Sequence, residues 1–370
     1  MSLYDRILRP RRYTLSDGTV VEEKRSRAPL VLLILVVLTA VSVRITGFNF
    51  SVLVKKGSKF FDILKAMFPP NTAYLGKIWQ PLLDTIKMSF LGSFIGAVLA
   101  IPFAIAAASN IVTNRVVVFL VRLFLSLVRT LPTLVCALIA TYIFGLGTMA
   151  GTCAIAVFTF AYVGKQLFEI IETVDMGPYE AMEALGATKL RAFVTAVFPQ
   201  VLPTYLSVSL FCLEGNVRYA SILGYVGAGG IGLLLNEKVS WREYDKVGTI
   251  LLLLFAVVYL MEHLSTWLTR LVQQERTLGR QGRRLLAGAA AALVLFCTVT
   301  LPPPDLSRTS MQMVKTLFTG LLHPNWELFF RLDSSGLAYL LLETVAIALV
   351  GTCVGAVFSV PLAFLGSSRF

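Results

Sequence analysis

Long apolar blocks alternate with shorter polar segments along most of the chain. A helix that crosses a hydrocarbon core about 30 Å thick needs about 20 predominantly apolar residues. On this basis the pattern predicts eight spans, near residues 29–45, 82–108, 133–144, 148–171, 201–223, 247–271, 285–301 and 340–366. We therefore expect an all-α fold, a polytopic transmembrane helix bundle.

The apolar block 116–144 is too long for one simple span and contains two arginines. We divide it at Pro132 into a surface helix and a short span. Arg115, Arg122 and Arg129 recur every seven residues, which puts them on one helical face, where they can lie among lipid headgroups. A second surface helix is predicted where apolar residues have helical spacing beside lysines: Phe60, Ile63, Leu64, Met67 and Phe68.

The chain contains an internal repeat. Residues 82–109 recur at 341–368 with a constant offset of 259 residues. The matched pairs include Asp84 with Glu343, Gly92 with Gly351, Gly96 with Gly355 and Pro102 with Pro361. The block 285–301 likewise corresponds to the first span. We expect one complete unit followed by the start of a second, truncated at Phe370.

Four regions follow from this pattern. Residues 1–28 form a cytoplasmic tail, and 29–81 the first span with an extracytoplasmic segment. Residues 82–271 form a core with a polar loop at 178–203, and 272–370 hold a linker, one span and the incomplete second unit. Arginines in the tail and near 276–284 agree with the positive-inside rule. The lysines of the outer segment oppose it: Lys55, Lys56, Lys59, Lys65 and Lys77.

Composition excludes an ordinary soluble domain, because 56% of the residues are hydrophobic and only 15% are charged. The net charge of +12 does not indicate nucleic acid, since the cations flank apolar blocks and form no basic domain. The five cysteines lie in apolar blocks without any C-x-x-C pair, and only His263 and His323 are present. We therefore expect no disulfide framework, no metal site and no cofactor. No cleavable signal is expected either, since a largely polar stretch precedes the first apolar block.

The polar loop "PYEAMEALGATKLRAFVTAVFPQVLP" at 178–203 carries the most specific motif. It resembles the "EAA" loop of ABC importer permeases at Glu180, Ala181, Gly186 and Pro199, and Ala187 is assigned with them to the coupling loop. Met182, Ala196 and Phe198 depart from that family's pattern. The resemblance implies a short coupling helix that docks into a groove of a cytoplasmic ATPase, with Gly186 turning the chain between two short helices. The alternative is an ordinary amphipathic loop.

The segment "FCLEGNVRYASILGYVGAGGIGLLL" at 211–235, taken with this loop, resembles the phosphonate branch of these permeases. The likeness covers about 81–272 and, in part, 340–370. It implies a type I importer permease (MetI-like) with a truncated second copy, a multi-pass protein of the bacterial cytoplasmic (inner) membrane and not an enzyme. The implied partners are an ATPase dimer, which uses the ATP, a periplasmic phosphonate-binding protein, a second permease subunit in a homodimer, and membrane lipid.

Two charges in this segment, Glu214 and Arg218, are four residues apart and hence neighbours on one helical face. Such charges face a bundle interior or water. A structural ion pair that fixes helix packing is the simpler interpretation. The alternative places Glu214, Asn216 and Arg218 in an anion translocation path.

The glycines of "GAGGIG" satisfy the dinucleotide-binding pattern, but they follow a membrane span and no βαβ unit surrounds them. We expect a glycine-rich turn at the outer mouth, in which Gly227, Gly229 and Gly230 either contact the solute or form a tight turn. Small residues on the second span predict close helix packing: Ser89, Gly92, Ser93 and Gly96.

The chain has no G-x-x-x-x-G-K-[ST] loop and no catalytic Ser/His/Asp or Cys/His group, so the energy source is expected on another subunit. Two alternatives stay open: an ion-coupled secondary carrier, and an impaired, truncated product of a two-unit permease gene.

Overall fold

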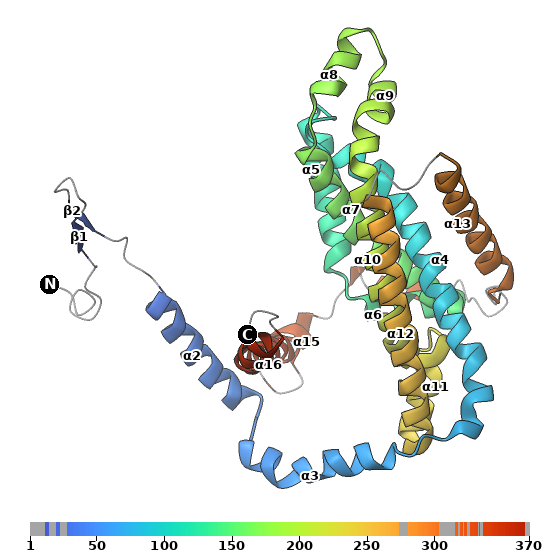
Figure 1. Cartoon of the computed structure of the whole chain (residues 1–370). Helices are drawn as coiled ribbons and strands as arrows, with labels where there is room; N and C mark the ends of the chain where they lie inside the picture. Colours follow the sequence, from blue (N-terminus) through green and yellow to red (C-terminus); the bar gives the residue numbers. More distant parts are fainter. Residues whose placement is uncertain are drawn as a thin grey trace. The chain divides into compact units, whose positions relative to one another are not determined.

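The structure is a computed structural model that describes residues 12–14, 20–22, 28–273, 280–302, 315–316, 319–320, 322–323, 326–331, 333 and 336–366. Apart from a hairpin of β1 (Arg12–Thr14) and β2 (Val20–Glu22), its described elements are helices, which confirms the predicted all-α class (Figure 1). The chain divides into unit 1 (Met1–Phe60 with His323–Phe370) and unit 2 (Phe61–Leu322). The arginines of residues 1–11 and Arg276, on which the predicted topology partly rests, lie outside the described residues.

Unit 2 is built on long helices: α4 (Leu75–Ala107), α7 (Thr148–Thr173), α10 (Phe198–Leu223) and α12 (Tyr244–Gln273). Helix α4 packs along α7, and α10 contacts α4, α7 and α12. Helix α4 begins seven residues before the predicted start at Leu82, because Ile78 and Leu82 are both buried against Ile231 and Ile250. Burial therefore extends the helix through Pro81.

Pro132 separates α5 (Arg115–Thr130) from α6 (Thr133–Phe144), and the two helices are bent by 87°. The side chain of Asn114 caps α5 by accepting hydrogen bonds from the amides of Val116 and Val117. Leu131 is extended, as a residue before proline prefers. The predicted division of this block is confirmed.

Within the described residues, five helices are long and apolar enough to cross a membrane, or six if the bent pair counts as one span. The other two of the eight predicted spans, the first and the seventh, lie on shorter apolar helices. The first predicted span lies in α2 (Ala28–Ile45), whose apolar part Pro29–Ile45 is at the lower limit of span length. The seventh lies in α13 (Arg280–Thr300), whose apolar part Ala287–Thr300 is below that limit because the first turns carry arginine.

Two further long helices are α3 (Phe50–Ala66) and α16 (Leu337–Leu365). The short elements are η1 (Thr72–Tyr74), α8 (Gly177–Ala184), α9 (Lys189–Ala192), η2 (Phe193–Val197), η3 (Gly224–Val226), α11 (Gly230–Ser240) and α15 (Trp326–Phe330). Helix α3 contains Phe60, Ile63 and Leu64 of the predicted surface helix and ends at Ala66, before Met67 and Phe68. Helix α16 is the repeat of α4, and in unit 1 it packs against α2.

Candidate functional site

The loop between α7 and α10 forms a helical hairpin whose turn is made by Gly186. This glycine has φ +83°, the left-handed region that residues with side chains avoid. Its amide donates to Glu183 O at 2.9 Å, and the amide of Ala187 donates to Met182 O at 3.0 Å. These two bonds form a Schellman motif that ends α8. The predicted turn between two short helices is confirmed.

The base of this hairpin is fixed to the bundle. Tyr179 is buried in the main apolar cluster of unit 2, and burial raises the pKa of its phenol. Gln200 Nε2 donates to Asp175 O at 3.1 Å, which ties the start of α10 to the start of the loop. Asp175 Oδ1 accepts from the amide of Gly177 at 2.9 Å. The base of the hairpin is therefore packed against both α7 and α10.

The tip of the hairpin is apolar and exposed. Leu185 is 84% exposed and Leu190 is 72% exposed. Of the residues assigned to the coupling loop, Glu180, Ala181, Gly186 and Pro199 are exposed and Ala187 is half-buried. Exposed leucines on a rigid hairpin between two long apolar helices are typical of a docking surface.

A polar cluster joins the ends of three helices beside this loop. The Arg122 guanidinium donates to Glu172 and, through Nε, to Ala107 O at 2.9 Å, and it lies 4.8 Å from the Phe168 ring. Glu172 also accepts from the amide of Ser109. Arg122 is thus paired with Glu172 against the bundle, and the placement of the arginine face among lipid headgroups stays a prediction. The sequence pattern gave no signal for this pair, whose members are 50 residues apart.

The predicted small-residue face of α4 packs against α7. A Cβ atom on Gly92 would come within 2.7 Å of Thr152 O, and one on Gly96 within 2.4 Å of Ala156 O. Ser89 and Ser93 are buried on the same face. The prediction of close helix approach is confirmed.

Asn216 lies in this packed interior, with 1% of its surface exposed. Its Nδ2 donates to Ser93 Oγ and to Thr159 Oγ1, both at 2.8 Å, and so joins α10 to α4 and α7. An amide in an apolar interior requires such partners. These contacts give Asn216 a packing role, and a place in a translocation path stays a prediction.

Glu214 and Arg218 form the predicted ion pair on α10. The Glu214 side chain is 11% exposed, whereas the Arg218 side chain is 53% exposed in this single chain. The pair therefore extends from the packed interior to the surface of unit 2, with its cation outward.

The glycine-rich segment is a tight turn packed inside unit 2. Gly227, Gly229 and Gly230 have φ values of +80°, +75° and +70°. Gly227 O accepts from the amide of Gly147 at 3.0 Å, and a Cβ on Gly229 would meet Thr148 N at 2.8 Å. The turn thus holds the α6–α7 connection against the start of α11, an 11-residue helix that the sequence pattern did not predict.

A charged clasp joins η1, α11 and α12, because the ammonium groups of Lys238 and Lys246 lie 5.6 Å and 5.5 Å from the centre of the Tyr74 ring. The Lys238 ammonium lies 2.9 Å from Glu237 Oε1 and 3.1 Å from Glu243 Oε2, and 4.2 Å from the Trp241 ring centre. The hydrogen bond that Lys238 donates to Glu237 raises the pKa of Lys238. Hydrogen bonds from Lys246 and Lys238 lower the pKa of Glu243.

We expect this clasp to make stability fall in acid. Because the folded-state pKa of Glu243 is lowered, its contribution is complete above the unfolded carboxyl pKa of about 4.3 and is lost as the pH falls through the folded-state pKa. Thermal unfolding of detergent-solubilised protein between pH 7 and pH 3 measures this. Glu243→Gln is expected to flatten the acid slope, and an unchanged slope would contradict the assignment.

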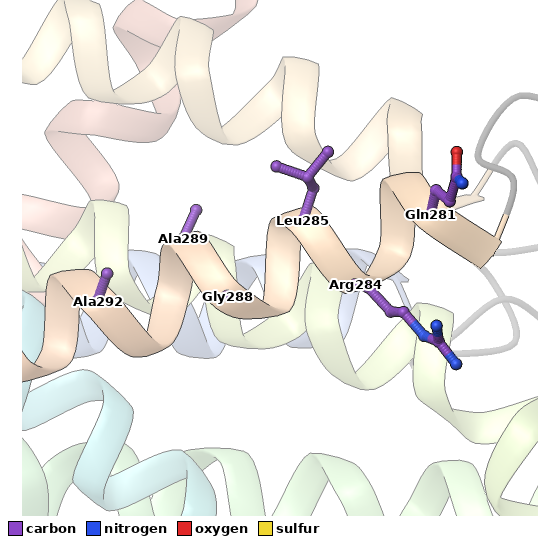
Figure 2. A pocket seen from close by; sticks show the side chains of 6 residues that line it. All are labelled: Gln281, Arg284, Leu285, Gly288, Ala289 and Ala292. Carbon is purple, nitrogen blue, oxygen red and sulfur yellow. The ribbon is translucent and has the colours of Figure 1, made fainter.

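A shallow pocket lies along α13, where Gln281, Arg284 and the small residues Gly288, Ala289 and Ala292 line it together with Leu285 (Figure 2). All six residues come from one helix, so the pocket lacks the convergent polar groups of a solute site. Among the described residues, no group of three His, Cys, Asp or Glu side chains is placed to hold a metal ion.

Residues 100–277 match the family described as "Binding-protein-dependent transport system inner membrane component". The Phosphate-import permease protein PhnE of Mycolicibacterium smegmatis is 35% identical over 212 residues, which are 57% of this chain and 40% of that protein. The Phosphite transport system permease protein PtxC of Stutzerimonas stutzeri is 36% identical over 201 residues, which are 54% of this chain and 73% of that protein. The matched part thus spans less than half of the Mycolicibacterium protein.

Among solved structures, a chain of the MetNI methionine ABC transporter in an inward-facing conformation matches with a TM-score of 0.50 and 22% identity. The match covers 55% of this chain and 99% of that chain. This likeness shows the fold and confirms the predicted type of helix bundle.

Proposed function

This chain belongs to the binding-protein-dependent transport system inner membrane components, and from that premise we propose that it moves phosphonate or a related phosphorus oxyanion across the cytoplasmic membrane. It is a membrane-spanning permease subunit of an ABC importer. Relatives named for phosphate import and phosphite transport support the class of solute.

The hairpin of α8 and α9 supplies the coupling to ATP hydrolysis, which takes place on a separate ATPase. Its exposed tip at Leu185 and Leu190 enters a groove of that subunit, as an amphipathic helix does in helix-in-groove recognition. The buried base around Tyr179 carries the movement of the ATPase into α7 and α10. A binding protein delivers the solute on the other side of the membrane.

The solute path lies between unit 2 and a second permease lobe. The exposure of Arg218 is the observation that supports an anionic solute. Its side chain is half exposed, while that of its partner Glu214 is buried. Arg218 is the only cation of α10, and a phosphorus oxyanion needs a cationic or N–H donor. The glycine turn next to α10 holds this end of the helix in place. A homodimer as the source of the second lobe stays a prediction.

We expect Arg218→Gln to lower phosphonate uptake by about tenfold, because a hydrogen bond to a charged group contributes roughly 1.5–3 kcal/mol. Uptake of labelled phosphonate, phosphite and methionine is measured in proteoliposomes that contain the permease, its ATPase and its binding protein. Arg218→Lys keeps the charge and is expected to retain part of the uptake.

The double variant Glu214→Gln with Arg218→Gln separates this role from a structural one. An ion pair that only fixes packing would lose thermal stability in Arg218→Gln and recover it, with uptake, in the double variant. Full uptake by the stable Arg218→Gln protein would refute the proposal.

A further inference from the structure

Helix α10 carries an exposed stripe with a gap in it. Phe211, Gly215, Arg218 and Ile222 follow one another at intervals of four, three and four residues, which places them along one side of the helix. Phe211 and Ile222 are both exposed. A Cβ atom added to Gly215 would meet no atom within 4 Å. The stripe is therefore open at Gly215, with a large apolar side chain towards either end.

Aromatic rings border this gap. Tyr219 follows Gly215 by one turn, and its side chain is exposed. The Tyr219 ring centre lies 6.2 Å from that of Phe158 on α7, and Phe158 is stacked on Tyr162 with ring centres 6.0 Å apart. The edge-to-face contact with Phe158 orients the Tyr219 ring. Phe211 and Tyr219 are eight residues apart, which is about 12 Å along the helix axis and leaves room for a small organic group over Gly215.

The charge of Arg218 indicates what faces this side of α10. The arginine is half exposed, and its partner Glu214 lies one turn nearer the middle of the helix. Charged groups within a membrane-spanning helix face water or the interior of a bundle, because their exposure to lipid is costly. Arg218 and Gly215 are three residues apart, so the cation and the gap are neighbours on the helix surface. The surface thus combines an anion-binding group, an open space and aromatic rings on the side of α10 that faces away from lipid.

We propose that the gap at Gly215, between Phe211 and Tyr219, is the subsite for the carbon substituent of an alkylphosphonate whose oxyanion binds the neighbouring arginine. This subsite presupposes the proposed transport of phosphorus oxyanions, and it adds that the path accepts a carbon group on phosphorus. An alkyl group is apolar, and small-molecule sites surround such groups with apolar and aromatic side chains. Phosphite and phosphate carry hydrogen or oxygen in place of the carbon and leave the gap to water. Gly215 is therefore a specificity-determining residue, because a larger side chain takes the space of the substituent.

The test fills the gap and compares solutes with and without carbon on phosphorus. Uptake of labelled phosphite, methylphosphonate and ethylphosphonate is measured in proteoliposomes that contain the permease, its ATPase and its binding protein. The ratio of variant to parent uptake, taken for each solute, removes the preference of the binding protein. Gly215→Leu is expected to lower ethylphosphonate uptake by about tenfold relative to phosphite uptake, the lower end of what one methylene group contributes in an apolar pocket. Gly215→Ala is expected to produce a smaller change in the same direction.

Gly76→Leu is the matched control, because Gly76 on α4 is also an open position of unit 2 where an added Cβ has no neighbour within 4 Å. It is expected to leave all three uptakes unchanged, and thermal unfolding in detergent checks that each variant is folded. Equal losses for all three solutes in Gly215→Leu and Gly215→Ala would overturn the proposal in favour of a packing surface, and unchanged uptake would place the substituent elsewhere. Uptake of phosphite alone by the parent protein would overturn the subsite and leave the proposed function standing, whereas uptake of none of the three would refute both.

Discussion

Replacing Gly186 with tryptophan is expected to abolish solute-stimulated ATP hydrolysis in the assembled importer while the permease still inserts into the membrane. The backbone at Gly186 has φ +83°, a conformation that disfavours a side chain by about 1–2 kcal/mol. The two hydrogen bonds of the Schellman turn hold Leu185 at the tip. Tryptophan both disturbs that turn and adds an indole to the surface that enters the ATPase groove.

The measurement compares hydrolysis with and without loaded binding protein in proteoliposomes. Gly186→Asn is expected to keep most of the stimulation, because asparagine tolerates the left-handed region and adds little volume. Gly145→Trp controls for strain alone, since Gly145 has φ +80° and open space around it but lies in the connection between α6 and α7. Unchanged stimulation in Gly186→Trp would count against a coupling role for the hairpin.

The features that the sequence predicted well depend on local chemistry. The break at Pro132 follows from the geometry of proline, and the turn at Gly186 from the freedom of glycine. The pairing of Glu214 with Arg218 follows from helical spacing alone. The small face of α4 was predictable because close helix packing in membranes requires small residues at a fixed period.

The features that it missed depend on partners distant in the chain. The sequence showed the seven-residue period of Arg122 but gave no sign of its partner Glu172. A solute path was the alternative for Asn216, and the sequence did not show that its amide donates to Ser93 and Thr159 in the packed interior. The clasp around Lys238 joins η1, α11 and α12, and no sequence motif marks its residues.

The first and seventh predicted spans lie on helices that are short for a bilayer. Mean apolarity identifies α2 and α13 as helices, and both are described as such. Length decides whether a helix crosses the bilayer, and the ends of these helices depend on where cationic residues stop the apolar run. Apolar pattern alone therefore predicts the helices more reliably than their path through the membrane.

Replacing Gly96 with leucine is expected to destabilise unit 2 by more than about 3 kcal/mol, the upper range for overpacking. A Cβ atom at this position would lie 2.4 Å from Ala156 O and 2.7 Å from Thr159 Cβ. Both helix backbones would have to separate, and the hydrogen bonds of Asn216 to Ser93 and Thr159 would be stretched at the same time.

The repeat supplies the matched control for this variant. Gly355→Leu makes the same change at the equivalent position of α16, where no atom lies within 4 Å of the added Cβ. Thermal unfolding and protease resistance in detergent are expected to fall sharply for Gly96→Leu and to stay at the level of the parent protein for Gly355→Leu. Equal losses in both variants would mean that leucine acts through the helix itself, and that backbone contact with α7 does not explain the glycine at position 96.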